Sequence, residues 1–523
     1  MGGGLMQLVA YGAQDIYLTG NPQITFFKVV YRRHTNFSME EIAQTPNGSV
    51  AFGGTASFTI SRNGDLVHKM YFEFSPKNTL TTVTTIAEAS ATTQTQLTTY
   101  VGNTILKEIE CEIGGQKIDR HYGHWLSTWA DLTERNPTGE IAQIGADANT
   151  TGSANNALLF EPGINGTTKA IGTASATGAE GGRPTKYQRM SFNHLGLGVS
   201  SNTGASAFCE ATGNHKANIL AAGSILPTKA QVPLRFWFNR NPGLALPLIA
   251  LQYHEVKINI KFCEAKDILS QSANGGGITE AGTGHALKEG KLFVQYIYLD
   301  TDERRRFAQV SHEYLIEQLQ FQNETGDGTT FTLNFNHPVK EIIWGGSPLP
   351  TGTLSGDSVT AASPPVSGPT VLSAFKAGVA GAANNTATMD FGGQIAFASD
   401  MNGSIDYNFC TQGGNAVNPG TWQLKLNGHD RFEPRPITYF SRQQIYDHHT
   451  GFGCVPSKDS ILVYSFALKP EEHQPSGTCN FSRIDTAQLI AKDVTINSGI
   501  HIYAVNYNVL RIMSGMGGLA YSN

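Results

Sequence analysis

Four short histidine motifs are the places where residue type and spacing could support chemistry in this sequence. They are His254-Glu255, His312-Glu313, His121 with His124, and the adjacent pair His448-His449. The first two begin like the helical zinc-protease motif, but that motif needs a second histidine four residues later, and positions 258 and 316 are both isoleucine. The other two motifs lack further ligands that the sequence can place beside them. We therefore expect structural or surface histidines and no metal site.

Other catalytic motifs are missing from the sequence as well. There is no nucleophile elbow of the form GxSxG and no phosphate-binding loop, since the glycine-rich stretch 515–518 lacks the Lys-Ser/Thr that such a loop uses. A glycosidase would need two carboxylates across one cleft, which the sequence alone cannot identify. We expect no catalytic residue, no cofactor and no enzymatic activity.

The six cysteines are widely separated and form no CxxC motif, which argues against zinc knuckles and thioredoxin-like chemistry. We expect reduced and mostly buried thiols, made in a reducing compartment. They are Cys111, Cys209, Cys263, Cys410, Cys454 and Cys479.

Charge and hydropathy limit the choice of partner. The chain has 37 basic and 42 acidic residues, a net charge of −5, which argues against coating nucleic acid. Its compact basic clusters are Arg32-Arg33 and Arg304–Arg306, and acidic neighbours accompany the second, so we expect a solvated turn there. No secretory signal is visible, and the longest apolar run, near Leu244–Leu251, contains a proline and is too short to span a membrane.

Apolar residues that alternate with polar ones predict most of the secondary structure in this sequence. This period of two is typical of strands with one buried and one wet face, as in antiparallel sheets. The alternating stretches are 55–60, 69–74, 108–113, 255–262, 331–336 and 422–427.

More continuous apolar runs predict central strands buried between two sheets. They are Phe26–Tyr31, Leu234–Phe238, Leu292–Leu299, Ile461–Leu468 and Ile500–Val505. Two pairs, Gly114-Gly115 and Asn427-Gly428, tolerate the positive φ of tight hairpin turns.

One helix is predicted over Tyr122–Arg135, where Trp125, Trp129 and Leu132 fall on one face and Asn136-Pro137 ends the pattern. We expect this tryptophan stripe to pack in a core, because a ligand platform is the less common use of such a stripe.

Four long stretches interrupt the strands: 75–104, 136–230, 264–290 and 345–420. Loops of this length usually have a role or local structure of their own, and we expect them on the surface. The candidate glycosylation sites Asn149, Asn165, Asn384 and Asn402 fall within them.

Strand-rich segments on both sides of residue 300 predict an all-β protein with two sandwiches or jelly rolls. We expect an N-terminal arm over 1–25, a first domain over 26–300, a linker over 301–311 and a second domain over 312–523. The patterns alone leave three functions open: a self-assembling structural protein, a carbohydrate-binding module for host attachment, and a jelly-roll enzyme.

Several long motifs narrow that choice. The run Gln7–Phe27 with Tyr31-Arg32-Arg33, and the later stretches Ile60–Leu66, Pro242–Val256, Gln474–Asp485 and Tyr507–Tyr521, resemble the major capsid proteins of nucleocytoplasmic large DNA viruses, especially the algal phycodnaviruses. Shorter matches at Asn47-Gly48-Ser49 and Glu112–Gln116 also belong to this resemblance. The four long loops are where the sequence departs from that family.

The resemblance implies a double jelly roll of two eight-stranded sandwiches. It also implies a homotrimeric, pseudo-hexagonal capsomer that tiles an icosahedral capsid in the virion, assembled in the host cytoplasm. The expected partners are other copies of the chain, minor capsid proteins and penton proteins. We expect no direct contact with nucleic acid, and only indirect contact with an internal membrane. The arm should dock below the capsomer, and the long loops should lie on its outer face.

Overall fold

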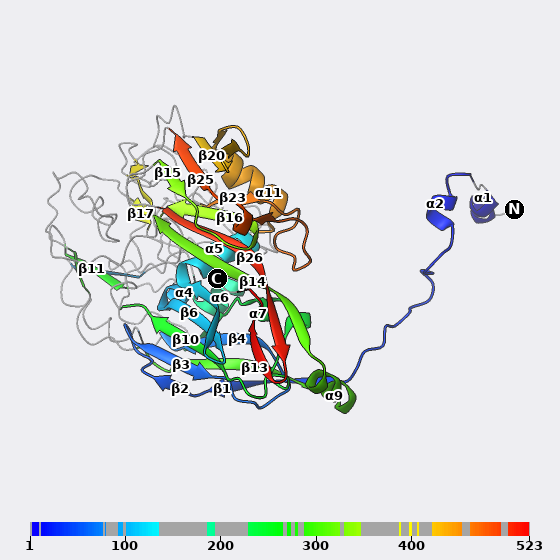
Figure 1. The fold of residues 1–523 in the computed structure, drawn as a ribbon, viewed down its shortest axis with the longest axis horizontal. Helices are drawn as coiled ribbons and strands as arrows, with labels where there is room; N and C mark the ends of the chain where they lie inside the picture. The colour runs from blue at the N-terminus through cyan, green and yellow to red at the C-terminus, as the bar shows by residue number, and fades with distance from the viewer. Residues whose placement is uncertain are drawn as a thin grey trace, which may run out of the picture.

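The computed structural model describes the β framework, several short helices and an extended N-terminal segment (Figure 1). The described residues are 3–9, 12–76, 79, 93–97, 101–134, 186–193, 228–264, 269–273, 278–280, 287–324, 329–346, 386–388, 397–399, 405–406, 421–451, 461–492 and 500–521. All strand pairs in these ranges are antiparallel, as the alternating patterns predict.

The first sandwich has two facing sheets, with strand orders β1-β13-β4-β8 and β3-β10-β6-β7. These strands are β1 (Phe37–Gln44), β3 (Thr55–Thr59), β4 (Leu66–Phe74), β6 (Leu106–Ile113), β7 (Gln116–Tyr122), β8 (Ala230–Pro233), β10 (Val256–Phe262) and β13 (Lys291–Leu299). The short strands β2 (Pro46–Gly48) and β9 (Leu246–Pro247) extend the two sheets beside β3 and β4.

The second sandwich repeats this arrangement, with orders β14-β26-β16-β23 and β15-β25-β20-β21. Its strands are β14 (His312–Glu324), β15 (Thr330–Thr332), β16 (Pro338–Gly346), β20 (Thr421–Leu426), β21 (His429–Asp430), β23 (Ile461–Ser465), β25 (Ala487–Lys492) and β26 (Ile500–Met513). Three short strands join at the edges: β22 (Arg435–Pro436), β24 (Cys479–Asn480) and β27 (Met516–Leu519).

The two halves therefore share one topology. Within each half, the first, eighth, third and sixth main strands form one sheet, and the second, seventh, fourth and fifth form the other. This is the connectivity of an eight-stranded jelly roll. The double jelly roll is thus confirmed, although no repeat between the two halves is visible in the sequence.

Alternating burial explains why these strands form. Along β10, Val256, Ile258 and Ile260 are buried, while Lys257 and Asn259 between them are partly exposed. The predicted turns also form, because Gly114 and Gly115 have φ of 59° and 85° and connect β6 to β7. Asn427 and Gly428, with φ of 51° and 79°, connect β20 to β21 in the same way.

The long connections of the first sandwich leave from one end of it. The end of β4 lies beside the start of β8 and the start of β13, since Phe74 pairs with Ala230 and Glu73 with Lys291. In the other sheet, the end of β10 lies beside the start of β6. The connection after β4 and the connection after β10 also meet, because β5 (Thr93–Leu97) pairs with β11 (Leu269–Ala273) and β11 with β12 (Ile278–Glu280).

The second sandwich places its corresponding connections in the same way. Gly345 near the end of β16 pairs with Ile461 at the start of β23, and Gly346 pairs with Ile500 at the start of β26. The connection after β16 contains a small sheet of β17 (Thr386–Thr388), β18 (Phe397–Ser399) and β19 (Ile405–Asp406). Both small sheets lie on the side of the molecule opposite the N-terminal segment in Figure 1.

The predicted helix is confirmed as α5 (Gly123–Thr133). The other α-helices in the described ranges are α1 (Gly3–Val9), α2 (Ile16–Thr19), α4 (Val101–Ile105), α6 (Lys186–Ser191), α7 (Trp237–Arg240), α9 (Thr301–Gln309) and α11 (Gln444–His448). A π-helical turn, η2 (Tyr439–Gln443), leads into α11, and two single 3₁₀ turns are η1 (Pro242–Leu244) and η3 (Phe481–Arg483).

Two predicted strands are wrong. Phe26–Tyr31 contains no strand and is exposed, and the first strand begins only at Phe37. Leu234–Phe238 is buried as predicted, but the chain turns into α7 there, where the Asn239 side chain accepts a hydrogen bond from the Phe236 amide. A short apolar run cannot distinguish a buried strand from a buried helical turn.

The charged connection near residue 300 is a helix and not a turn. Asp300 caps α9 by accepting a hydrogen bond from the Thr301 amide at 2.8 Å, and acidic residues occupy the first turn. Arg304 from this helix pairs with Asp65 of the first sandwich at 3.0 Å, so that part of the basic cluster is neutralised within the chain.

Candidate assembly site: the seam and the N-terminal arm

A continuous interface joins the two sandwiches, and we call it the seam. It is formed by β7, α5 and α7 of the first half with β14, β16, β23 and β26 of the second. Trp125, Trp129 and Leu132 of α5 pack there with Ile343 and Val463, among other apolar residues of the second half. The tryptophan stripe is therefore core packing, as predicted, and this core belongs to both halves.

Backbone-directed hydrogen bonds align the two halves along β7 and β14. The Leu319 amide donates to Asp119 Oδ1 at 3.0 Å, and the Gln318 side chain donates to the Ile118 carbonyl. Asp119 also pairs with His121, whose Nε2 lies 2.9 Å from Oδ2. His121 thus supports a carboxylate that fixes the neighbouring strand.

A buried ionic cluster lies in the seam around Glu317 of β14. Arg240 of α7 and Lys340 of β16 both pair with its carboxylate, and the Lys340 ammonium lies 2.8 Å away with its side chain fully buried. Burial alone would raise the pKa of Glu317, but the charges of Arg240 and Lys340 outweigh it and hold that pKa well below its usual value. Arg240 also stacks over Trp129 at 5.2 Å, so one guanidinium connects the ionic cluster to the tryptophan stripe.

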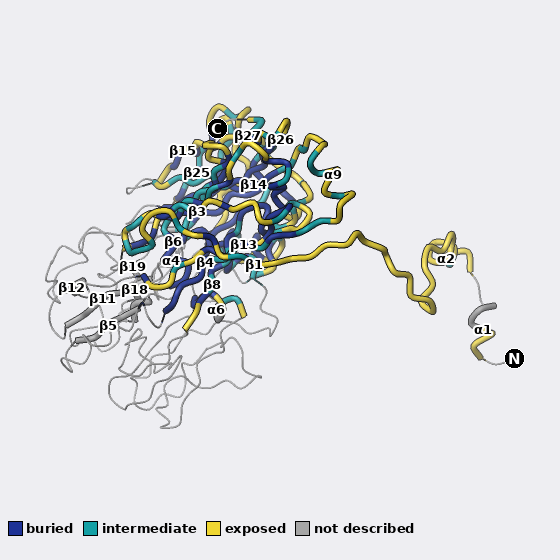
Figure 2. Tube along the Cα trace, turned by 90° about the horizontal axis from the view of Figure 1, so that it is seen from below, coloured by how far each residue is buried: buried dark blue, intermediate teal, exposed yellow. Residues whose placement is uncertain are grey.

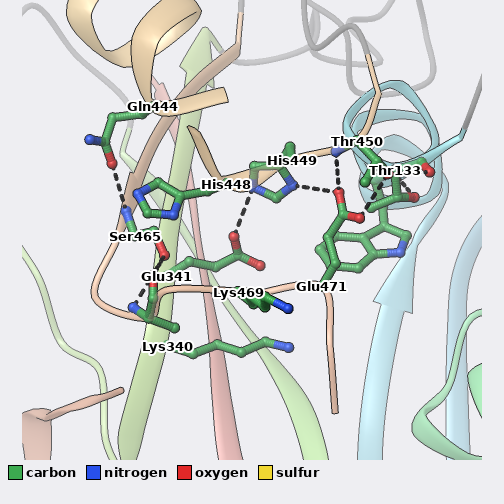
Figure 3. A network of polar contacts seen from close by, with 12 residues as sticks. Thr133, Lys340, Glu341, Gln444, His448, His449, Thr450, Ser465, Lys469 and Glu471 are labelled. Carbon is green, nitrogen blue, oxygen red and sulfur yellow. Dashed lines mark hydrogen bonds and ion pairs between the residues drawn. The ribbon is translucent and has the colours of Figure 1, made fainter. Parts of the chain in front are cut away.

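A second polar network surrounds His449, just after α11 (Figure 3). Its Nε2 lies 3.0 Å from Glu341 of β16, and its Nδ1 lies 3.1 Å from Glu471. Burial alone would lower the pKa of His449, but the charge of Glu341 and the hydrogen bonds to both carboxylates raise it to about 9. His449 is therefore a buried cation at neutral pH, bound between two carboxylates.

This network is attached to the first sandwich through residues 450 and 451. Thr450 donates from its hydroxyl to Glu471 at 2.8 Å, and that hydroxyl also lies 3.2 Å from the Thr133 carbonyl at the end of α5. The Gly451 amide donates to the Leu132 carbonyl at 2.7 Å. A Cβ at Gly451 would come within 2.4 Å of the Asp131 carbonyl oxygen, so a side chain cannot be accommodated without displacing the α5 terminus.

His124 has the opposite electrostatic character. It hydrogen-bonds the Tyr503 hydroxyl and packs against Tyr122 and Phe321, all within the seam. Burial lowers its pKa to about 3, so His124 is neutral at physiological pH. The HxxH pair thus has two separate structural partners, and within the described ranges no three His, Cys, Asp or Glu side chains are grouped to hold a metal ion.

In contrast to the buried seam, the N-terminal segment is exposed to solvent. Residues 20–36 contain neither helix nor strand, and they extend away from the sandwiches in Figures 1 and 2. Phe26 and Phe27 are 90% and 97% exposed, and Ile24, Val29 and Tyr31 are exposed as well. We call residues 12–36 the arm. An isolated soluble chain gains nothing by exposing so many large apolar side chains.

Comparison with known proteins decides the family. The family model described as "Large eukaryotic DNA virus major capsid protein" matches residues 303–518, and "Major capsid protein N-terminus" matches residues 25–157 and 214–300. The major capsid protein of Pyramimonas orientalis virus is 42% identical over 542 residues, with all of both chains covered.

The chain belongs to the major capsid proteins of large eukaryotic DNA viruses.

A second relative and a solved structure are consistent with this family, and a third protein shares the fold. The major capsid protein of Paramecium bursaria Chlorella virus 1 is 37% identical with all of both chains covered. Among solved structures, the "PBCV-1 virus capsid, quasi-atomic model" is 33% identical with a TM-score of 0.60 and covers 95% of this chain and 100% of its own. The Faustovirus major capsid protein, at 13% identity and a TM-score of 0.53, shares the fold over 96% of this chain and 94% of its own.

The remaining histidine motifs of this capsid protein also have structural roles. His254 Nδ1 lies 2.9 Å from the Gly517 carbonyl oxygen, and His312 Nε2 lies 2.8 Å from the Phe307 carbonyl oxygen. The glycine-rich stretch 515–518 spans the β26–β27 hairpin, and its Gly515 carbonyl accepts a hydrogen bond from the Tyr253 amide at 3.0 Å. This hairpin attaches the C-terminal end to the first sandwich.

Several predicted residues lie outside the described part of the capsid protein. They are Asn149, Asn165, Asn384 and Asn402, together with Cys209, Cys410 and Cys454. Of the described thiols, Cys111 and Cys263 are buried and Cys479 is partly exposed. Among the described residues, no helix combines the length and apolar character needed to cross a membrane.

The sequence did not point to the buried charges of the seam. Arg240, Glu317 and Lys340 are ordinary residues of their segments, and only the fold brings them together. His448-His449 was a visible motif, but its partners Glu341 and Glu471 lie far from it in the sequence.

Proposed function

We propose that three copies of this chain form a pseudo-hexagonal capsomer that tiles an icosahedral shell. The observation that carries this proposal is the repeated strand order of two jelly rolls joined by one buried seam. Three such chains present six similar lobes, so an object with threefold symmetry fits a lattice site with six neighbours. A rigid seam is required, because mobile halves could not present lobes at fixed angles.

Contacts within the trimer and contacts between capsomers need different strengths. Contacts inside the trimer are heterologous and close into a ring, and they need obligate interfaces of at least about 2,000 Å². Contacts between capsomers can be weaker, because each repeats many times and multivalency adds them. We accordingly propose copies of this chain as the main partners, with minor capsid and penton proteins at the joints of the lattice.

The orientation of the capsomer is supported by the position of its ends. The long connections leave from one end of each sandwich, and their small sheets lie opposite the arm (Figure 1). We propose that this end faces outward, where insertions disturb no tiling contact. The arm and the residues before it, which together contain the predicted segment 1–25, then lie below the capsomer against neighbouring subunits or minor capsid proteins.

The remaining parts of the proposal concern domains, chemistry and location. We propose the division into 1–25, 26–300, 301–311 and 312–523, with regular structure of the first jelly roll beginning at Phe37. We also propose a structural, non-enzymatic role, which the family supports. The net charge of −5 supports the absence of direct nucleic-acid contact. From the family we also propose assembly in the host cytoplasm and only indirect contact with an internal membrane.

Native mass spectrometry of the purified chain at low concentration tests the capsomer. We expect a species of three times 56.3 kDa that persists on dilution and does not depend on sugars. A chain that is monomeric in dilute solution and binds soluble carbohydrate would contradict the proposal and favour the alternative, a jelly-roll module for host attachment.

A further inference from the structure

The arm and one sheet edge of this chain are each incomplete. The arm segment 24–31 has the apolar and β-branched composition that predicts a strand, yet it has no strand partner among the described residues and is exposed. At the same time, β1 is an eight-residue edge strand that pairs, among the strands of the described ranges, on one side only, with β13. Long exposed edge strands are usually covered, because their unpaired amides recruit other strands.

The edge strand β1 also exposes apolar side chains. Phe37 and Met39 are each 54% exposed, and they lie on the same face of the strand because side chains alternate. Such an edge, with free backbone groups and apolar side chains together, has the properties that strand addition uses.

The charges on β1 indicate which segment of the chain could pair with its free edge. Glu40 and Glu41 are exposed at the centre of β1, and neither forms an ion pair within the described ranges. Glu40 accepts a hydrogen bond from the Tyr298 hydroxyl and Glu41 accepts one from the Gln295 side chain, and both donors are neutral. The arm carries the opposite charge, with Lys28 inside the apolar segment and Arg32-Arg33 just after it.

Building on the capsomer proposal, we propose that residues 24–31 of one copy pair as an antiparallel strand with the free edge of β1 in a neighbouring copy. Of the antiparallel registers, the one that places Lys28 opposite Glu40 also places Val29 opposite Met39 and Tyr31 opposite Phe37. Both segments have eight residues, so this register leaves neither with an overhang.

The donor is another copy and not the same chain. Residues 32–36 would be long enough to close a hairpin onto their own β1, but they are extended and continue away from it (Figure 2). A shell of identical chains supplies a neighbouring arm for every β1 edge.

Disulfide trapping between two tagged forms tests this inference. One form carries Val29→Cys and the other Met39→Cys, and the two are co-expressed, assembled and mildly oxidised. We expect a link between differently tagged chains, formed about fivefold more than with Lys28→Cys and Met39→Cys, whose side chains would point to opposite faces. The unmutated chain gives the background from native cysteines. In addition, Glu40→Lys should reduce the link, and Lys28→Glu in the donor should restore it.

Native mass spectrometry of the same samples separates the two proposals. Trimers or larger assemblies without the inter-chain link would overturn the strand exchange and leave the capsomer intact. A link within single chains, seen when both cysteines are placed in one copy and absent between copies, would also overturn it. Absence of any oligomer would overturn both proposals.

Discussion

At the scale of single residues, this capsid protein is unusual in placing charged groups inside its seam. Lys340 and Glu341 are fully buried neighbours on β16, and each pairs with a partner of opposite charge. Removing one partner of a buried pair leaves an uncompensated charge, which costs about 3–5 kcal/mol. Such pairs permit one arrangement of the two sandwiches and penalise others, which is useful in a subunit whose lobes must meet a lattice.

His449 makes the folded arrangement less stable as the pH becomes alkaline. Its pKa rises from 6.5 to about 9 on folding, so the folded state holds the proton more tightly. The resulting stabilisation, roughly 3 kcal/mol at most, is complete below pH 6.5 and is lost as pH rises through about 9. We expect His449→Gln to lower the thermal unfolding midpoint at pH 6.5 and to flatten its decline between pH 7 and 9.5, measured by differential scanning calorimetry.

His124 provides the matched control on the acid side. Its pKa falls to about 3 on folding, so its contribution is present above pH 6.5 and is lost as pH falls toward 3. His124→Phe keeps an aromatic ring in the seam and should flatten only the acid side of the profile. If His449→Gln left the alkaline slope of the wild-type chain unchanged, the assignment of a buried cation at that position would be wrong.

At the scale of elements, α5 contributes Trp125, Trp129 and Leu132 to the apolar contact between the jelly rolls. Trp129→Ala would leave a large cavity between α5 and β23, with an expected loss of about 3–5 kcal/mol. Because the cavity lies in the seam, the two halves should unfold separately, and calorimetry should resolve two transitions where the wild type has one. Trp129→Phe retains a ring beneath Arg240 and should lose less; equal stability of all three proteins would contradict this role of α5.

The same elements show how far the sequence could predict the structure. Strands such as β10 and helix α5 follow from periodicity, because one face of each is buried. The arm segment 26–31 was expected to be a buried strand, but it is exposed. Its apolar composition predicts that it becomes buried, and does not say whether the same chain or another copy buries it. The seam charges could not be predicted, because Arg240 and Glu317 are 77 residues apart and meet only after both sandwiches have formed.

At the scale of the whole molecule, two jelly rolls of equal topology behave as one body with an exposed arm. The seam combines an apolar core, two ionic networks and the C-terminal hairpin, so its geometry is set by several independent contacts. The arm has no such support from the described residues, which is consistent with a segment that is completed by assembly.

Electron microscopy of the purified oligomer tests the central claim most directly, by averaging end-on views of single particles. The account predicts a threefold-symmetric particle with a hexagonal outline and six lobes, two from each chain. Particles with two lobes, or rings whose lobe number is not twice the number of chains, would contradict it.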